Sequence, residues 1–112
     1  MKCNFCKITK SELGELIYKD DQVVAFNDIT PQAPTHILII PRRHISTIND
    51  TSQADEQLLG HLITTATQLA RNNNIANAGY RLVLNCNKIG GQAVYHIHLH
   101  LLGGRQMNWP PG

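Results

Sequence analysis

The sequence predicts a single α+β domain, residues 1–112, in which a mainly antiparallel sheet packs against one long helix. The chain has 112 residues, and a second domain would need roughly 50 residues of its own. Hydrophobic patterns along the chain follow the order strand, strand, helix, strand, strand. A glycine-containing connection at residues 86–93 is typical of a hairpin between antiparallel strands.

Two short apolar runs predict the first two strands. Residues 22–26 (QVVAF) follow a turn-forming segment, KDD, at residues 19–21. Residues 35–40 (THILII) are almost continuously apolar, which indicates a central strand that is covered on both faces. Pro34 before this strand and Pro41 after it mark its two ends.

The long helix begins at a capping-box pattern, in which Ser52 is followed three residues later by Asp55. Apolar side chains then recur at three- and four-residue steps, as one helix face requires: Leu58, Leu59, Leu62, Ile63, Ala66, Leu69 and Ala70. The run Asn72-Asn73-Asn74 contains poor helix formers, so we expect the helix to end there.

Residues 81–85 and 94–102 predict the last two strands, and the second of these contains half of the six histidines in the chain. Side chains alternate between the faces of a strand, so three histidines share one face: His96, His98 and His100. The other face is apolar and is expected to pack under the helix.

This histidine face has three possible interpretations: an ordinary half-exposed face, a three-histidine metal site, or a catalytic face that acts on phosphate. Along a regular strand His96 and His100 start about 13 Å apart, whereas Zn–N bonds are about 2 Å, so one metal does not suit all three. Imidazole also serves as a nucleophile and as a proton donor to phosphate oxygens. Gly90-Gly91-Gln92 and Asn85 lie near enough to supply anion donors.

Composition and charge exclude several classes of protein. No apolar run approaches the ~20 residues of a membrane span. The first residues lack the apolar core of a signal peptide, so we expect a cytoplasmic protein without a membrane partner. A net charge of +2 is too small for a general nucleic-acid binder.

The three cysteines argue against a disulfide framework in such a compartment. Cys3 and Cys6 form a C-x-x-C pair, which is either half of a zinc site or two ordinary thiols. We expect His61 to be a solvated residue of the helix surface. His36 begins the second strand, and a packing role and a site role are both open for it.

Residues 96–102 (HIHLHLL) match the motif His-φ-His-φ-His-φ-φ, with φ apolar, at all seven positions. The chain therefore resembles the histidine triad (HIT) superfamily. Further segments resemble its Hint branch of nucleotide-binding phosphoramidases: residues 26–36, 40–45, 90–92 and 102–112. The similarity covers essentially the whole chain.

The resemblance implies a HIT fold, with a five-stranded sheet, the long helix and a short N-terminal helix, and a homodimer that joins two such sheets. It implies hydrolysis of nucleoside 5′-phosphoramidates, adenosine preferred, to AMP and an amine. His98 would attack the α-phosphorus and form a nucleotidyl-histidine. His100 would contact the phosphate and assist proton transfer.

The same resemblance implies a set of purine nucleotide-binding residues. Asp28 would bind the ribose hydroxyls, a task that suits a carboxylate. The base slot would consist of Phe5, Ile8, Phe26 and Ile29. The phosphate or leaving group would meet Asn85, Gly91, Gln92, Ala93 and Val94. Trp109 would help to select the substrate, reaching toward the partner's site. Ala93 stands where many Hint proteins have a serine that contacts the α-phosphate.

With Cys3 and Cys6, the chain resembles a cysteine-containing, zinc-binding branch of the superfamily. By that resemblance Cys3, Cys6, His44 and His96 would hold a structural Zn²⁺, since Cys₂His₂ is a complete tetrahedral set. Two other functions stay open. One is hydrolysis or nucleotidyl transfer on dinucleoside polyphosphates. The other is a nucleotide-binding interaction protein with incidental catalysis.

Overall fold

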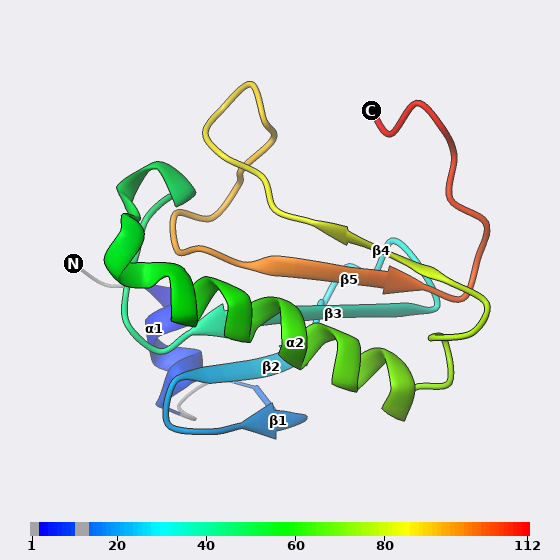
Figure 1. Ribbon diagram of the computed structural model, residues 1–112, viewed down its shortest axis with the longest axis horizontal. Helices are drawn as coiled ribbons and strands as arrows, with labels where there is room; N and C mark the ends of the chain where they lie inside the picture. The colour runs from blue at the N-terminus through cyan, green and yellow to red at the C-terminus, as the bar shows by residue number, and fades with distance from the viewer. Residues whose placement is uncertain (1–2, 11–13) are drawn as a thin grey trace.

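A computed structural model of the protein describes residues 3–10 and 14–112. Five strands form one antiparallel sheet in the order β1-β2-β3-β5-β4 (Figure 1). The strands are β1 (Tyr18–Lys19), β2 (Val23–Asn27), β3 (Thr35–Pro41), β4 (Tyr80–Val83) and β5 (Leu99–Gly103). This confirms the α+β class and the antiparallel sheet.

The helix α2 (Glu56–Asn72) runs along one face of the sheet (Figure 1). Ser52 caps a short 3₁₀ turn, Gln53–Asp55, with the predicted reciprocal bonds to Asp55, and this turn leads into α2. Apolar side chains of α2 meet Val23, Ile37 and Leu101 in the larger of two buried clusters. Asn74 has φ 59°, a left-handed conformation that ends the helix in the predicted asparagine run.

The opposite face of the sheet carries the short helix α1 (Asn4–Thr9). The intervening residues of β2 and β3 point to this side and form a second buried cluster, of which Phe26 and Leu38 are members. Phe5 and Ile8 of α1 pack against that cluster. Because β2 and β3 are covered on both faces, their near-continuous apolar runs are explained.

The last strand is shorter than predicted: β5 begins at Leu99, not at residue 94. The register places Ile39 opposite Leu99, so Pro41 would stand opposite Ile97. Proline has no N–H to offer a neighbouring strand, and the ladder stops there. The Ile97 N–H instead donates to the Ile45 carbonyl oxygen, over 2.8 Å. Residues 94–98 are therefore an irregular segment that leads into β5.

Side chains still alternate between the two faces of the sheet in this irregular segment. Ile97, Leu99 and Leu101 are buried in the α2-side cluster. Phe5, from the other face, stands against the rings of both His96 and His98. The predicted separation of a histidine face from an apolar face is confirmed. In the two described ranges, no helix has the length and apolar character that crossing a membrane requires.

Candidate active site and metal centre

A pocket of about 680 Å³ opens on the α1 side of the sheet. Nine of the predicted nucleotide-binding residues line it: Phe5, Ile8, Phe26, Asp28, Ile29, Ala93, Val94, His98 and His100. Apolar side chains from α1 and β2 form one wall. Asp28 and two histidines supply polar groups, a combination typical of small-molecule sites. The sequence missed Asn4, Glu15 and Ile17, which also line the pocket.

Four predicted nucleotide-binding residues lie outside this lining: Asn85, Gly91, Gln92 and Trp109. The buried Gln92 side chain accepts from the Asn87 N–H and donates to the carbonyl oxygens of Ser46 and Val94. Its amide thus braces the loop that precedes the histidines. Asn85 lies beside Gly91, and Trp109 is 83% exposed.

The main chain fixes the tautomer of the neutral His98 ring. Its Nδ1 lies 2.8 Å from the main-chain carbonyl oxygen of His96, which only accepts hydrogen bonds. Nδ1 of the neutral ring therefore carries the proton, and Nε2 keeps its lone pair. The ring is packed between Phe5 and His100, at centroid distances of 5.3 and 4.9 Å. A neutral imidazole with a free Nε2 at a pocket wall is suited to act as a nucleophile.

His100 is oriented by a residue that the sequence left undecided, His36. The Gln32 N–H donates to His36 Nδ1 over 3.0 Å, so the proton of His36 is on Nε2. That Nε2 lies 2.9 Å from His100 Nδ1 and donates to it. His100 must then carry its own proton on Nε2, which makes this nitrogen a donor. His36 is buried, and its role is to fix the tautomer of His100.

The surroundings keep His100 neutral. Burial, followed by the neighbouring His98 and His36, lowers the pKa of His100 to about 4. Burial also lowers the pKa of His36, against the opposing pull of Asp28. Asp28 itself accepts the Thr30 N–H at Oδ1 over 2.8 Å, which fixes its carboxylate at the pocket rim. The site thus places the N–H donor of neutral His100 beside the ring of His98.

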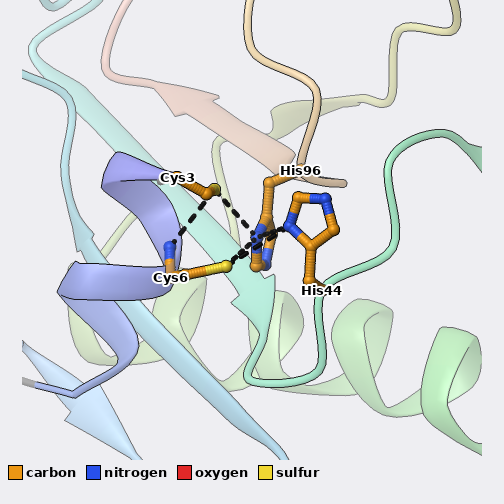
Figure 2. Close-up of side chains that lie close together, drawn as sticks. All are labelled: Cys3, Cys6, His44 and His96. Carbon is orange, nitrogen blue, oxygen red and sulfur yellow. Dashed lines mark hydrogen bonds between the residues drawn. The ribbon is translucent and has the colours of Figure 1, made fainter. Parts of the chain in front are cut away.

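Cys3, Cys6, His44 and His96 form a second cluster next to the pocket (Figure 2). Cys3 caps the N-terminus of α1 and Cys6 lies within it, whereas His44 follows β3 and His96 precedes β5. The two Nδ1 atoms lie 3.1 Å apart, and the sulfur–nitrogen distances are 3.3–3.5 Å. The four predicted metal ligands are therefore brought together.

The donor set fits a metal ion. His96 Nε2 donates to the Pro41 carbonyl oxygen over 2.8 Å, so its Nδ1 lone pair faces the sulfurs. Burial, together with Cys3, raises the pKa of the Cys6 thiol. Two thiols and two imidazole lone pairs that converge in this way favour a cation, which would displace the thiol protons.

Asp28, His36 and His100 also lie within metal-binding reach of one another, but they do not fit a metal. The Gln32 N–H occupies His36 Nδ1 and leaves a proton, not a lone pair, on the nitrogen that faces His100. The contrast with His96 separates a cluster that could hold a metal ion from a hydrogen-bond chain that does not fit one.

The prediction for His61 is wrong. It is half-buried, and its Nε2 lies 2.7 Å from Asp20 Oδ2, in a contact that ties α2 to the β1–β2 turn. Asp20 also accepts from the main-chain N–H groups of Gln22 and Val23, and these bonds together hold the pKa of its carboxyl well below the usual range.

Residues 10–107 match the family model of the HIT domain. The chain belongs to the HIT domain family. Within that family it is 56% identical to the purine nucleoside phosphoramidase of Escherichia coli K12 over 104 residues, 92% of this chain and 87% of the relative.

Solved HIT structures share the whole architecture. A HIT family hydrolase from Legionella pneumophila superposes with a TM-score of 0.96 at 54% identity, and the match covers 99% of this chain and 100% of that one. A histidine triad protein from Clostridium difficile gives 0.91 at 36% identity, over 95% and 93% of the two chains. The predicted HIT fold is confirmed.

Proposed function

We propose that this HIT protein hydrolyses the P–N bond of purine nucleoside 5′-phosphoramidates, with adenosine preferred, and releases AMP and an amine. The observation that supports this most directly is the His98 tautomer: a neutral ring whose Nε2 lone pair is free at the pocket. The E. coli relative, itself named a purine nucleoside phosphoramidase, is 56% identical to this chain over 87% of its own length.

The proposed reaction has two steps. His98 Nε2 attacks the α-phosphorus, the P–N bond breaks, and the amine leaves with a proton. Water then attacks the nucleotidyl-histidine, which restores free His98 and yields AMP. His100 carries an Nε2 proton that suits a hydrogen bond to a phosphate oxygen. Because the neutral His100 ring keeps this proton, the proton that the departing amine takes comes from solvent.

Substrate recognition follows from the pocket walls. Phe5, Ile8, Phe26 and Ile29 offer an apolar slot for a purine. Asp28 at the rim has acceptor capacity for the two ribose hydroxyls. Ala93 and Val94, which line the pocket, are assigned to the phosphate. Asn85, Gly91 and Gln92 of the same loop are assigned to support it from outside the lining, where Gln92 braces the main chain. Trp109, in the exposed tail, is assigned to substrate selection in a homodimer.

We further propose that the metal is Zn²⁺ and that its role is structural. Tetrahedral Zn²⁺, with bonds of about 2.0–2.1 Å to nitrogen and 2.3 Å to sulfur, separates its ligand atoms by roughly 3.3–3.8 Å. The distances among Cys6, His44 and His96 are 3.1–3.5 Å. Zinc in native protein, lost in a Cys3→Ala/Cys6→Ala variant, is the expected metal analysis; metal-free native protein would contradict it.

The proposal includes a cytoplasmic location, because the three cysteines are free, and free thiols persist in a reducing compartment. It includes no nucleic-acid or membrane partner.

The test compares adenosine phosphoramidate with a dinucleoside polyphosphate as substrates. We expect kcat/KM to be far higher for the phosphoramidate, and the His98→Ala variant to lose turnover while it keeps the fold and AMP binding. A His61→Ala variant, altered at a histidine outside the pocket, is the control. Preference for the dinucleoside polyphosphate would replace the proposal with the second enzymatic function. AMP binding without turnover of either substrate would favour a nucleotide-binding interaction protein.

A further inference from the structure

We propose that the metal at Cys3, Cys6, His44 and His96 sets the affinity for the nucleotide by fixing helix α1 against the sheet. The coupling rests on the proposed function, since it concerns the same nucleotide pocket. It assigns the metal centre a task beyond local stability: the metal holds one wall of the base slot.

Helix α1 does not hold itself in place. It has six residues, and isolated helices shorter than about 12 residues are marginal in water. Its N-terminal cap is a thiol, with the Cys6 N–H 3.4 Å from Cys3 Sγ, which is a weak hydrogen bond. Its position must therefore come from tertiary contacts.

Besides the apolar packing of Phe5 and Ile8, polar contacts among the described residues fasten α1 at both of its ends. At its C-terminal end, the Arg42 guanidinium donates to the Thr9 carbonyl oxygen over 2.6 Å. At its N-terminal end, Cys3 and Cys6 face the two histidines (Figure 2). Arg42 contributes with or without metal, whereas thiols and neutral imidazoles attract each other strongly only through a cation. The N-terminal fastening is the one that a metal controls.

The histidine half of the cluster is independently fixed. His96 is fully buried, donates to the Pro41 carbonyl oxygen, and is followed by Ile97, whose N–H is bonded to Ile45. The cysteine half belongs to the short helix. Loss of metal is therefore expected to release α1 and to leave the segment before β5 in place.

Release of α1 would act on the base slot. Phe5 lies between the two cysteine ligands in the sequence, and its ring stands 5.4 Å from that of Phe26 and 5.3 Å from that of His98. Ile8, one turn further along, lines the same pocket. The groups that orient the reacting histidines, the His96 carbonyl and His36, lie outside α1. Affinity should change, and the chemical step should not.

The experiment compares zinc-loaded and chelator-treated protein, with the fold of each checked by circular dichroism. We expect the Kd for AMP, measured by calorimetry, to rise about tenfold or more on metal removal as Phe5 and Ile8 lose their contact with the base. The kcat should change less than about threefold. Cys3→Ser/Cys6→Ser should reproduce the metal-free Kd, and Cys86→Ser, a thiol outside the cluster, should keep the zinc-loaded value.

A second readout needs no nucleotide. Zinc alone should slow hydrogen exchange of the Lys7 amide, which donates to the Cys3 carbonyl oxygen within α1 over 3.1 Å. Phe5→Ala should raise the Kd for AMP in zinc-loaded protein. In metal-free protein it should raise this Kd little further, because metal removal and Phe5→Ala disrupt the same wall of the base slot and their effects are not additive. If Phe5→Ala leaves the Kd of zinc-loaded protein for AMP unchanged, the assignment of Phe5 to the wall of the base slot is wrong.

An equal AMP affinity with and without zinc would overturn the coupling, even if phosphoramidate turnover were normal. Absence of turnover in both forms, with a Kd that still responds to zinc, would overturn the proposed function and leave the coupling intact. The two failures are therefore distinguishable.

Discussion

His100 links the active site to the pH dependence of stability. Its pKa is lowered to about 4 by burial and by two neighbouring histidines, whereas an exposed histidine titrates near 6.5. The unfolded chain therefore binds the proton more readily between these two values. Stability contributed by neutral His100 is complete above about pH 6.5 and is lost as the pH falls toward 4.

We predict that a His100→Asn variant loses less stability than wild type between pH 7 and pH 4.5. The difference should be on the order of 1–2 kcal/mol, a value reduced for the partial exposure of this side chain. Denaturant unfolding of both proteins at each pH measures it, and acid effects on the metal centre cancel in the comparison. Parallel pH profiles would show that His100 titrates normally in the folded state.

Ala93 is the residue at which this chain departs from many Hint proteins. It lines the pocket, and a serine hydroxyl there would add one hydrogen bond to the α-phosphate. One such bond contributes about 0.5–1.5 kcal/mol, so Ala93→Ser should raise kcat/KM for a phosphoramidate roughly two- to tenfold. An unchanged or lower kcat/KM would mean that residue 93 is not directed at the phosphate.

At the residue scale, the sequence could identify His96, His98 and His100 because their spacing is itself the signal. His36 lacked such a signal: its role arises from the Gln32 N–H and from a strand neighbour 64 positions away. His61 was misjudged for the same reason, since its partner Asp20 lies on a different element. Periodicity predicts the face on which a side chain lies, but it does not predict which residue of another element that side chain contacts.

At the scale of elements, the loop between β4 and the histidine segment depends on a glycine for close packing. A Cβ on Gly90 would overlap the carbonyl oxygen of Cys86, which is main chain and has little room to move. Gly60, in the exposed part of α2, has nothing within 4 Å of such a Cβ. These two glycines form a matched pair.

We predict that Gly90→Ala lowers both the free energy of unfolding and kcat/KM, because the loop that Gln92 braces must shift. Gly60→Ala should instead stabilise the protein by about 0.5–1 kcal/mol, since alanine is the better helix former. Denaturant midpoints and phosphoramidate kinetics of both variants provide the measurement. A Gly90→Ala protein with wild-type stability and rate would contradict the close packing.

The elements themselves were largely predictable from the sequence. The apolar period predicted the helix face, and prolines predicted the ends of β3. The capping box at Ser52 caps a 3₁₀ turn, and α2 itself begins only at Glu56. The premature end of the β3–β5 ladder was not predicted, because it depends on which residue stands opposite Pro41. Register depends on both paired strands and cannot be predicted from one of them. The apolar alternation before Leu99 continues although these residues make no strand hydrogen bonds to β3.

In the whole molecule, β4 lies at an edge of the sheet, and among residues 3–10 and 14–112 one row of its main-chain groups has no strand partner. Beside it, between α2 and β4, is an apolar groove of about 320 Å³. Its lining includes Leu82 and Leu84 of the β4 region and Ile63 of α2, which is 50% exposed. A free edge next to an apolar groove supports the homodimer expected from the family resemblance.

We predict that the protein elutes with a mass twice its 12.5 kDa chain mass in size-exclusion chromatography with light scattering. Ile63→Glu should shift it toward the monomer, as a charge would be buried in the interface. Thr64→Glu, on the neighbouring exposed position of α2 outside the groove, is the control. A wild-type monomer would contradict the dimer, and an Ile63→Glu dimer would place its interface elsewhere.

The central claim is that His98 becomes covalently bonded to the nucleotide. The most direct measurement is mass spectrometry of protein mixed with adenosine phosphoramidate and quenched within the first turnover at neutral or alkaline pH, where a phosphohistidine-type bond survives. We predict one added AMP group on the peptide that contains His98, and the absence of this adduct in the His98→Ala protein. An adduct on another residue, or rapid turnover by the His98→Ala protein, would contradict it.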